Sequence, residues 1–328
     1  MKIGPRTCRG AAANYHRGMP TRSLTTLLSG LIDYAGLFPP AKLSMQHAVE
    51  AYARARVGEH EWMLCRFVCP AARLKELSQC ASVLMPGTNA TSGYREHADI
   101  TEPWHISALV ETPDELDIIH KFNQHHDQEV NGLALVDAIE IKLTSPDEAD
   151  DILDTVPEEI YPFLELPAGV DPRGFIAAMA GNACAAKIRT GGVTPEAIPS
   201  PEQVAAFMNA CVLADVPFKA TAGLHHPIRG EYALTYEKNA PRAVMHGFLN
   251  VFVAAALLKH VRADEQLAID VLRETDPKAF VFTEEGVRWR THVLDAAQLA
   301  HSREAFSLTF GSCSFDEPVE DLKKIGMA

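Results

Sequence analysis

Two lysines lie at or near the C-terminal ends of short apolar runs, and a glycine-containing turn follows each of them. Lys187 belongs to the segment CAAKIRTGG, and Lys219 belongs to VPFKATAG. An ammonium group at the end of a buried strand must be paired, desolvated or in use, because an unpaired buried charge is costly. Desolvation or a neighbouring cation lowers the pKa of a lysine and makes its amine nucleophilic. Two such lysines therefore indicate an amine that attacks a carbonyl and forms a Schiff base.

Further polar residues near predicted strand ends could complete this site. Alternate side chains of a strand share one face, so Lys187 and Arg189 point the same way. Glu140 is the best placed carboxylate to move the protons that carbinolamine formation and carbon–carbon cleavage require. An ion-pair network without a catalytic role is the competing interpretation. The residues that we assign to substrate binding are Asp33, Glu165, Arg189, His225, His226 and Arg229.

Strands that alternate with helices must position these residues. Apolar runs near residues 31, 62, 105, 138, 161, 184 and 216 predict strands, and their continuous apolar character suits a sheet that is covered on both faces. The stretch 246–253 is an eighth candidate strand, although it could equally open a helix. Four strands are followed by a capping residue and then a proline, which predicts a helix start. These pairs are Thr112-Pro113, Ser145-Pro146, Asp171-Pro172 and Ser200-Pro201.

Seven or eight such units predict a (β/α)8 TIM barrel, an α/β fold whose working residues lie at the C-terminal ends of the strands. We expect the barrel over residues 23–262 and a small C-terminal α+β appendage over residues 263–328. Residues 1–22 hold five basic residues and no acidic one. We expect them to form a flexible tail, or to be an over-extended start with Met19 as the initiator.

Composition narrows the class of partner. The chain has 328 residues and a formal net charge of −13, which argues against a nucleic-acid or anionic-membrane partner. Its seven cysteines form no disulfide framework by their spacing, and no apolar run is long enough to span a bilayer. We therefore expect a cytoplasmic protein that acts on a small-molecule substrate, with no nucleic-acid or membrane partner. The oligomeric state stays open, a homo-oligomer included.

Five segments resemble, in order and spacing, motifs of the deoxyribose-phosphate aldolase family of class I aldolases. The resemblance implies the same barrel, with Lys187 as the Schiff-base nucleophile and Lys219 as the residue that lowers its pKa. It implies that Glu140 replaces the family's aspartate in proton transfer and that Asp33 lies in the pocket. We expect neither a cofactor nor a metal. The matching segments are IDY from Ile32, LCRFVCP from Leu64, AIEI from Ala138, KIRTG from Lys187 and KATAG from Lys219.

Departures from that family concern the substrate. The family holds a substrate phosphate with backbone N–H groups of a Gly-Gly pair after the second lysine and of a Gly-Thr-Ser segment near the eighth strand. Here these places read Gly223-Leu-His225-His226 and Asn250-Val-Phe. We therefore expect an aldolase or lyase that acts on a small, non-phosphorylated carbonyl compound such as a keto acid. The connection 224–245 is longer than in the family and is expected to form a lid or a carboxylate clamp.

Two other functions remain open. His225 and His226, with His246, could serve a metal-assisted lyase or hydrolase on the same barrel. Adjacent histidines of an extended segment point to opposite sides, so only one of them would face a given ion unless the chain turns. A non-catalytic barrel that binds a small molecule is the third interpretation.

Overall fold

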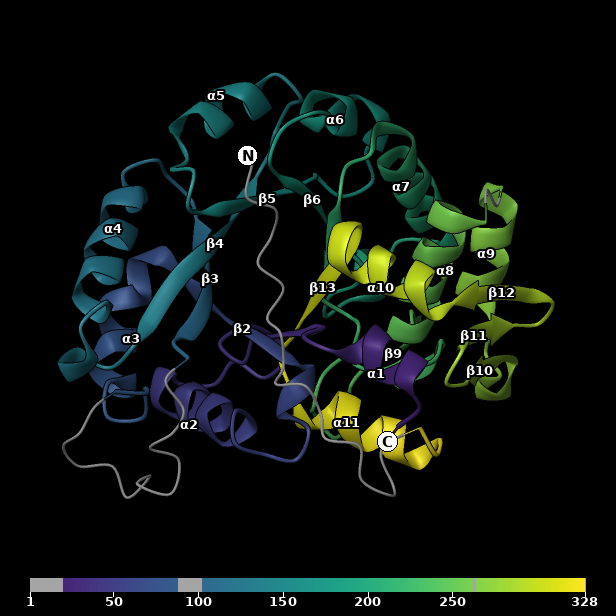
Figure 1. Cartoon of the computed structure of the whole chain (residues 1–328), viewed down its shortest axis with the longest axis horizontal. Helices are drawn as coiled ribbons and strands as arrows, with labels where there is room; N and C mark the ends of the chain where they lie inside the picture. The colour runs from purple at the N-terminus through teal and green to yellow at the C-terminus, as the bar shows by residue number, and fades with distance from the viewer. Residues whose placement is uncertain (1–19, 88–101, 262–263, 328) are drawn as a thin grey trace.

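Eight parallel strands close into a barrel (Figure 1), which confirms the predicted fold class. The computed structural model describes residues 20–87, 102–261 and 264–327. The predicted tail therefore lies outside the described residues except at its end, where Arg22 begins helix α1 (Arg22–Leu28). In their order around the barrel, the strands are β1 (Ile32–Tyr34), β13 (Ser307–Ser312), β7 (Phe218–Thr221), β6 (Ala185–Arg189), β5 (Tyr161–Glu165), β4 (Ala134–Lys142), β3 (Trp104–Val110) and β2 (Leu64–Pro70).

Helices surround the barrel on its outside (Figure 1). The predicted capping residues begin two of them as expected, because the side chains of Asp171 and Ser200 accept backbone hydrogen bonds in the first turn. After Pro113 and Pro146, the helix starts two residues later than the proline position predicts. The helices are α2 (Met45–Ala55), α3 (Leu74–Ala81), α4 (Glu115–His126), α5 (Glu148–Thr155), α6 (Pro172–Met179), α7 (Pro201–Ala214), α8 (Phe248–His260) and α11 (Asp316–Lys324).

The eighth barrel strand is β13, and the stretch 246–253 does not form a strand. Helix α8 begins at Phe248, and all its residues up to Leu258 are buried. An apolar run that is buried on every side shows no helical periodicity, so its sequence cannot be distinguished from a buried strand. Strand β13 pairs in parallel with both β1 and β7 and thereby closes the barrel.

The expected boundary between the barrel and a C-terminal appendage at residue 263 is also wrong, because β13 belongs to the barrel. A small α+β unit is present, but it is inserted before the last barrel strand. It contains α9 (Glu265–Arg273), an antiparallel sheet of β10 (Phe280–Phe282), β11 (Gly286–Trp289) and β12 (His292–Asp295), and α10 (Ala296–Ala305). The barrel is therefore built from both sides of this unit, and the sequence from 263 onward is not a separate appendage.

A buried arginine ties the closing strand to the start of the barrel. The Arg303 guanidinium donates hydrogen bonds to the carbonyls of Ser307 and Leu308 at the start of β13. It also donates to the carbonyls of Leu27, at 2.8 Å, and Ser29, at 3.2 Å. This one side chain thus donates hydrogen bonds both to backbone carbonyls at the C-terminal end of α1 and to backbone carbonyls of β13.

The barrel interior changes from polar to apolar and back to polar along the strands. Near the N-terminal ends, Arg66 forms an ion pair with Asp137, which also contacts His105 at 3.0 Å. Charged side chains lie on the other side, toward the C-terminal strand ends where TIM barrels carry their active sites. The apolar cluster in between consists of Ala138, Tyr161, Phe163, Ala185 and Leu308.

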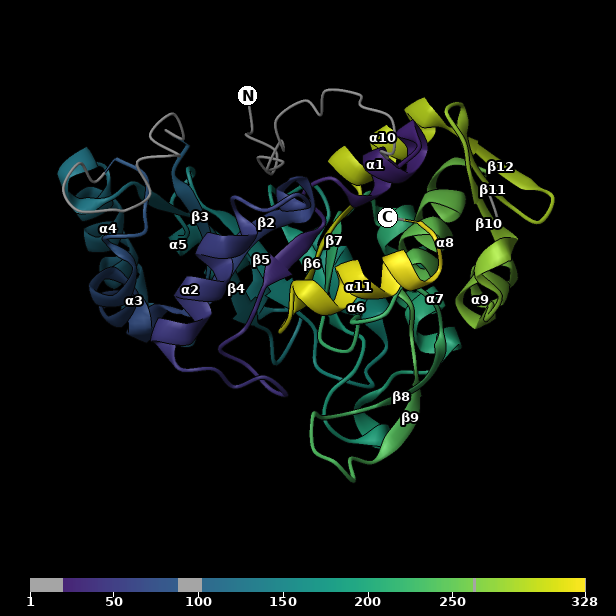
Figure 2. The same cartoon turned by 90° about the horizontal axis from the view of Figure 1, so that it is seen from below.

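An antiparallel hairpin interrupts the connection between β7 and α8. Its strands are β8 (Gly230–Ala233) and β9 (Arg242–Met245), and Figure 2 shows that it projects beyond the barrel.

Among the described residues, no helix combines the length and the apolar character that a membrane span requires.

Candidate active site

Lys187 and Lys219 are neighbours across β6 and β7, as predicted. They are direct partners in the parallel register of the two strands, and Glu165 of β5 is in turn the partner of Lys187. The Lys187 Nζ lies 2.6 Å from Oε2 of Glu140 and also forms an ion pair with Glu165. Each of these three side chains is nearly completely buried.

Lys219 lies deeper and is fully buried. Its Nζ is 2.6 Å from Oε1 of Glu140 and 2.5 Å from Oδ2 of Asp33, and it lies 5.0 Å from the centre of the Phe163 ring. Oδ2 of Asp33 accepts a second hydrogen bond from the Thr309 hydroxyl at 2.8 Å. The ammonium group therefore has two carboxylate partners and an aromatic face beside it.

The pKa values follow from these pairs. Burial by itself raises the pKa of Glu140, but the ammonium groups of Lys187 and Lys219 outweigh burial and hold that pKa well below its usual range. Burial lowers the pKa of Lys219, but Asp33 and Glu140 outweigh it, so that the pKa is raised overall. Lys219 is therefore a permanent cation beside Lys187 at neutral pH, and Glu140 is a permanent anion between them.

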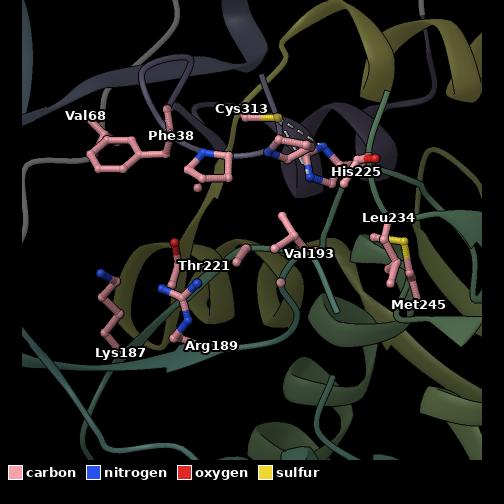
Figure 3. A pocket seen from close by; sticks show the side chains of 18 of the residues that line it. Phe38, Val68, Lys187, Arg189, Val193, Thr221, His225, Leu234, Met245 and Cys313 are labelled. Carbon is pink, nitrogen blue, oxygen red and sulfur yellow. Dashed lines mark hydrogen bonds between the residues drawn. The ribbon is translucent and has the colours of Figure 1, made fainter. Parts of the chain in front are cut away.

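A cavity of about 400 Å³ lies over this charge cluster at the C-terminal end of the barrel. Lys187, Arg189, Glu140 and Glu165 line it, as their assignment to the site predicted. Figure 3 shows Lys187 and Arg189 on one side of the cavity. Apolar side chains form much of the remaining wall, namely Phe38, Val68, Leu109, Val193, Leu234 and Met245.

Asp33 does not reach the cavity. Its side chain has no exposed surface, and it lies below with Lys219 as the nearest cation. Oδ1 of Asp33 accepts a hydrogen bond from the backbone N–H of Arg66 at 3.0 Å. The structure thus corrects the expected substrate contact, because every contact of this carboxylate is to the protein interior.

Arg189 is the predicted substrate-binding residue with the most freedom. Its side chain is 45% exposed, and its Nη1 lies 3.8 Å from Oε1 of Glu165. Such a loosely held guanidinium can bind a ligand carboxylate in the bidentate manner that arginine favours.

Both histidines of the 225–226 pair line the cavity, although an extended segment would separate them. The chain turns just before them, with positive φ angles of 59° at Ala222 and 76° at Gly223. His226 is held by Asp321, at 2.5 Å, and its ring stacks on Tyr232. His225 contacts Oε2 of Glu317 at 3.2 Å.

Arg229 does not line the cavity. Its Nη1 lies 3.5 Å from Nδ1 of His246, whose Nε2 is 2.8 Å from the Pro199 carbonyl. The structure therefore removes Arg229 from the substrate-binding set and separates His246 from the adjacent histidines. No group of three or more His, Cys, Asp or Glu side chains within residues 20–87, 102–261 and 264–327 is arranged to hold a metal ion.

The 224–245 connection covers the cavity, as a lid would. Its residues Ala233, Leu234, Thr235 and Tyr236 form part of the wall. The hairpin supplies no guanidinium to the cavity, because Arg242 is exposed and paired with Glu231 at 3.4 Å. The connection is thus a cover and does not form a carboxylate clamp.

Cys313 and Glu317, which the sequence did not indicate, are the cavity residues with the chemistry of a nucleophile and a carboxylate beside a histidine. Cys313 directly follows β13, and Glu317 lies in the first turn of α11. Both would have been candidates if the eighth strand had been placed at 307–312, because barrel sites gather at strand ends.

Comparisons with protein-family models, with curated proteins and with solved structures found no match.

Proposed function

We propose that the protein is a class I lyase that forms a Schiff base between Lys187 and a small carbonyl compound. One observation carries the proposal: a buried lysine amine faces the cavity between two carboxylates, with a second buried ammonium directly behind it. The resemblance to the deoxyribose-phosphate aldolase family supports the same assignment. A pair of lysines and a carboxylate at these strand ends has the composition that imine chemistry requires.

The first step is the transfer of a proton from Lys187 to Glu165. Glu140 is the poorer acceptor, because Lys219 and the Ser107 hydroxyl, at 2.6 and 2.7 Å, already occupy Oε1 and stabilise its charge. The neutral amine then adds to the carbonyl carbon and gives a carbinolamine. Protonated Glu165 returns its proton to the carbinolamine hydroxyl, which leaves as water and gives the protonated imine. The imine accepts the electron pair of the carbon–carbon bond as that bond breaks, and the Glu165 carboxylate takes the proton of the substrate hydroxyl, so that an aldehyde and an enamine result. Protonation of the enamine by Glu165 and hydrolysis of the resulting imine release the second product and restore Lys187. Throughout these steps, Glu140 stabilises the positive charge that Lys187 carries as ammonium and as iminium.

The cavity indicates the class of substrate. Its volume of about 400 Å³ suits a small molecule, and its wall combines apolar side chains with the charged groups around Lys187. Arg189 provides one guanidinium at the edge, which favours a substrate with a carboxylate. We therefore propose a non-phosphorylated keto acid or a related carbonyl compound.

Borohydride trapping tests the proposal. The protein is incubated with pyruvate, glyoxylate or small aldehydes, reduced with sodium borohydride and analysed by intact mass and peptide mapping. We expect an adduct on the peptide that contains Lys187, and its loss in Lys187→Met. Lys142→Met is the matched control, because Lys142 is an exposed lysine of the same cavity wall.

Absence of an adduct on Lys187 with every carbonyl compound would overturn the proposal. If such a compound nevertheless bound with equal affinity to the wild-type protein and to Lys187→Met, a binding protein without imine chemistry would replace it.

A further inference from the structure

A second reactive cluster faces the same cavity from the side opposite the lysines. Cys313 directly follows β13, and His225 lies in the loop that follows β7. Sγ of Cys313 is 4.0 Å from both ring nitrogens of His225. Oε2 of Glu317 is 3.2 Å from the His225 Nδ1. Figure 3 shows Cys313 and His225 across the cavity from Lys187.

This arrangement places a nucleophile, a base and an orienting carboxylate in sequence. His225 has Nε2 available to the sulfur while Nδ1 faces Glu317, which is the order of roles in catalytic triads. All three residues line the cavity. A ligand in the cavity can therefore reach the sulfur, although Cys313 is only 5% exposed. The mechanism proposed for Lys187 uses none of these groups.

The electrostatics of the cluster favour a charged pair. Burial raises the pKa of Cys313, but the interaction with His225 outweighs burial and lowers it overall. Burial lowers the pKa of His225, but Cys313 and Glu317 outweigh it and raise it overall. The other titratable groups that act on the pair are Tyr34, His226 and Tyr236, whose hydroxyl lies 3.6 Å from Sγ.

We propose that Cys313 is a second nucleophile of the cavity, which His225 and Glu317 hold as a thiolate and which adds reversibly to a ligand aldehyde. A sulfur lone pair forms the carbon–sulfur bond, and the carbonyl π electrons move to oxygen. The imidazolium of His225 gives its proton to that oxygen, which leaves a hemithioacetal and a neutral imidazole. The reverse of these steps releases the aldehyde, so that no further reactant is consumed.

The aldehyde class rests on the proposed function, because cleavage of a carbon–carbon bond next to a hydroxyl group leaves an aldehyde fragment in this cavity. The thiolate itself rests only on the cluster. Its reaction with an aldehyde needs no amine, and the two proposals can therefore be tested separately.

Alkylation by iodoacetamide across pH 5 to 9, followed by peptide mapping, tests the thiolate. The half-buried Cys80 is the internal control. We expect the midpoint of the rate profile of Cys313 to lie about one pH unit or more below that of Cys80, and to rise by a similar amount in His225→Asn and Glu317→Gln. A midpoint at or above that of Cys80, a midpoint unchanged by His225→Asn, or no alkylation of Cys313 at any pH would overturn the proposal.

Protection of Cys313 by propionaldehyde tests the carbonyl addition. We expect propionaldehyde to slow alkylation of Cys313 in the wild-type protein and equally in Lys187→Met, and to leave Cys80 unaffected. Protection that disappears in Lys187→Met would assign the aldehyde to the lysine and overturn addition to Cys313. Trapping on Lys187 without any protection of Cys313 would overturn this proposal alone, whereas protection without trapping would overturn only the proposed lyase.

Discussion

Lys187 and Lys219 face each other in the register of β6 and β7, and their ammonium groups bind the two different oxygens of Glu140. One carboxylate thus separates two buried cations that would otherwise repel each other. Because Lys187 reaches the cavity and Lys219 does not, the pair is asymmetric: one amine can meet a ligand, and the other supplies fixed charge.

Replacement of the shared carboxylate should destabilise the fold. Glu140→Gln leaves two buried ammonium groups with one fewer anion, and we expect the free energy of unfolding to fall by about 3 kcal/mol, as when other buried pairs lose a partner. Urea denaturation at pH 7 measures the loss. Glu111→Gln, at an exposed position of the cavity wall, should change the free energy of unfolding by less than about 0.5 kcal/mol. Equal stability of Glu140→Gln and the wild-type protein would show that the cluster relaxes without cost.

The same carboxylate should make stability depend on acidity. The pKa of Glu140 is depressed in the folded protein, whereas in the unfolded chain it is about 4.3. Below that pH the unfolded chain binds a proton that the folded protein does not, so stability falls as the pH falls. We expect Glu140→Gln to reduce the slope of unfolding free energy against pH between about 3 and 4.5, by up to about 1.4 kcal/mol per pH unit. Urea titrations at a series of pH values measure both slopes, and parallel curves would contradict the assignment.

A close contact between two glycines should make one of them irreplaceable. Gly223 has a φ of 76°, and a Cβ atom there would lie 2.8 Å from the Cα of Gly191. We expect Gly223→Ala to cost more than about 2 kcal/mol, because the strain of the left-handed backbone and a backbone clash combine. Gly169→Ala is the matched control, with a φ of 74° and open space around it, and should cost only about 1 kcal/mol. Thermal unfolding compares the two, and equal losses would contradict the predicted clash.

Removal of the buried Arg303 guanidinium, which contacts the closing strand β13, should also lower the free energy of unfolding. Arg303→Met leaves carbonyls of Leu27, Ser29 and Ser307 without this donor in the interior. We expect a loss of about 3 kcal/mol, since each buried carbonyl that loses its partner costs about 1 kcal/mol or more. Arg173→Met, which removes an exposed ion pair with Asp171, should leave the stability nearly unchanged. Chemical denaturation distinguishes the two variants, and similar losses would argue that water replaces Arg303 as donor.

The sequence predicts the first seven barrel strands and the lysine pair because these strands are apolar runs, and helix-starting residues follow four of them. The eighth strand was missed for a physical reason. Its register is irregular between Ser307 and Phe310, so Leu308 packs in the inner apolar cluster while Thr309 binds Asp33. A strand that begins and ends with serine and serves a polar interior has no apolar run to reveal it.

The candidate site could be predicted only as far as strand position determines it. Lys187, Arg189, Glu140 and Glu165 lie near predicted strand ends, which is why the sequence could indicate that they share one cavity. The sequence does not show how far below the cavity a side chain lies along the barrel axis. For this reason it predicts Asp33 at the cavity, although the residue lies below it. Loop residues depend on turns: the positive φ angles at Ala222 and Gly223 bring His225 to the wall, and no spacing rule specified them.

The site cannot be completed until β13 has been synthesised, because β13 is the last barrel strand in the sequence. Thr309 and its acceptor Asp33 are 276 positions apart, and the strand that carries Thr309 is the last to leave the ribosome. Until then, β1 and β7 lack the strand that joins them in the barrel. The lysine cluster is consequently completed only after the other seven strands have been made, so a prematurely terminated polypeptide would have both lysines without the enclosed pocket around them.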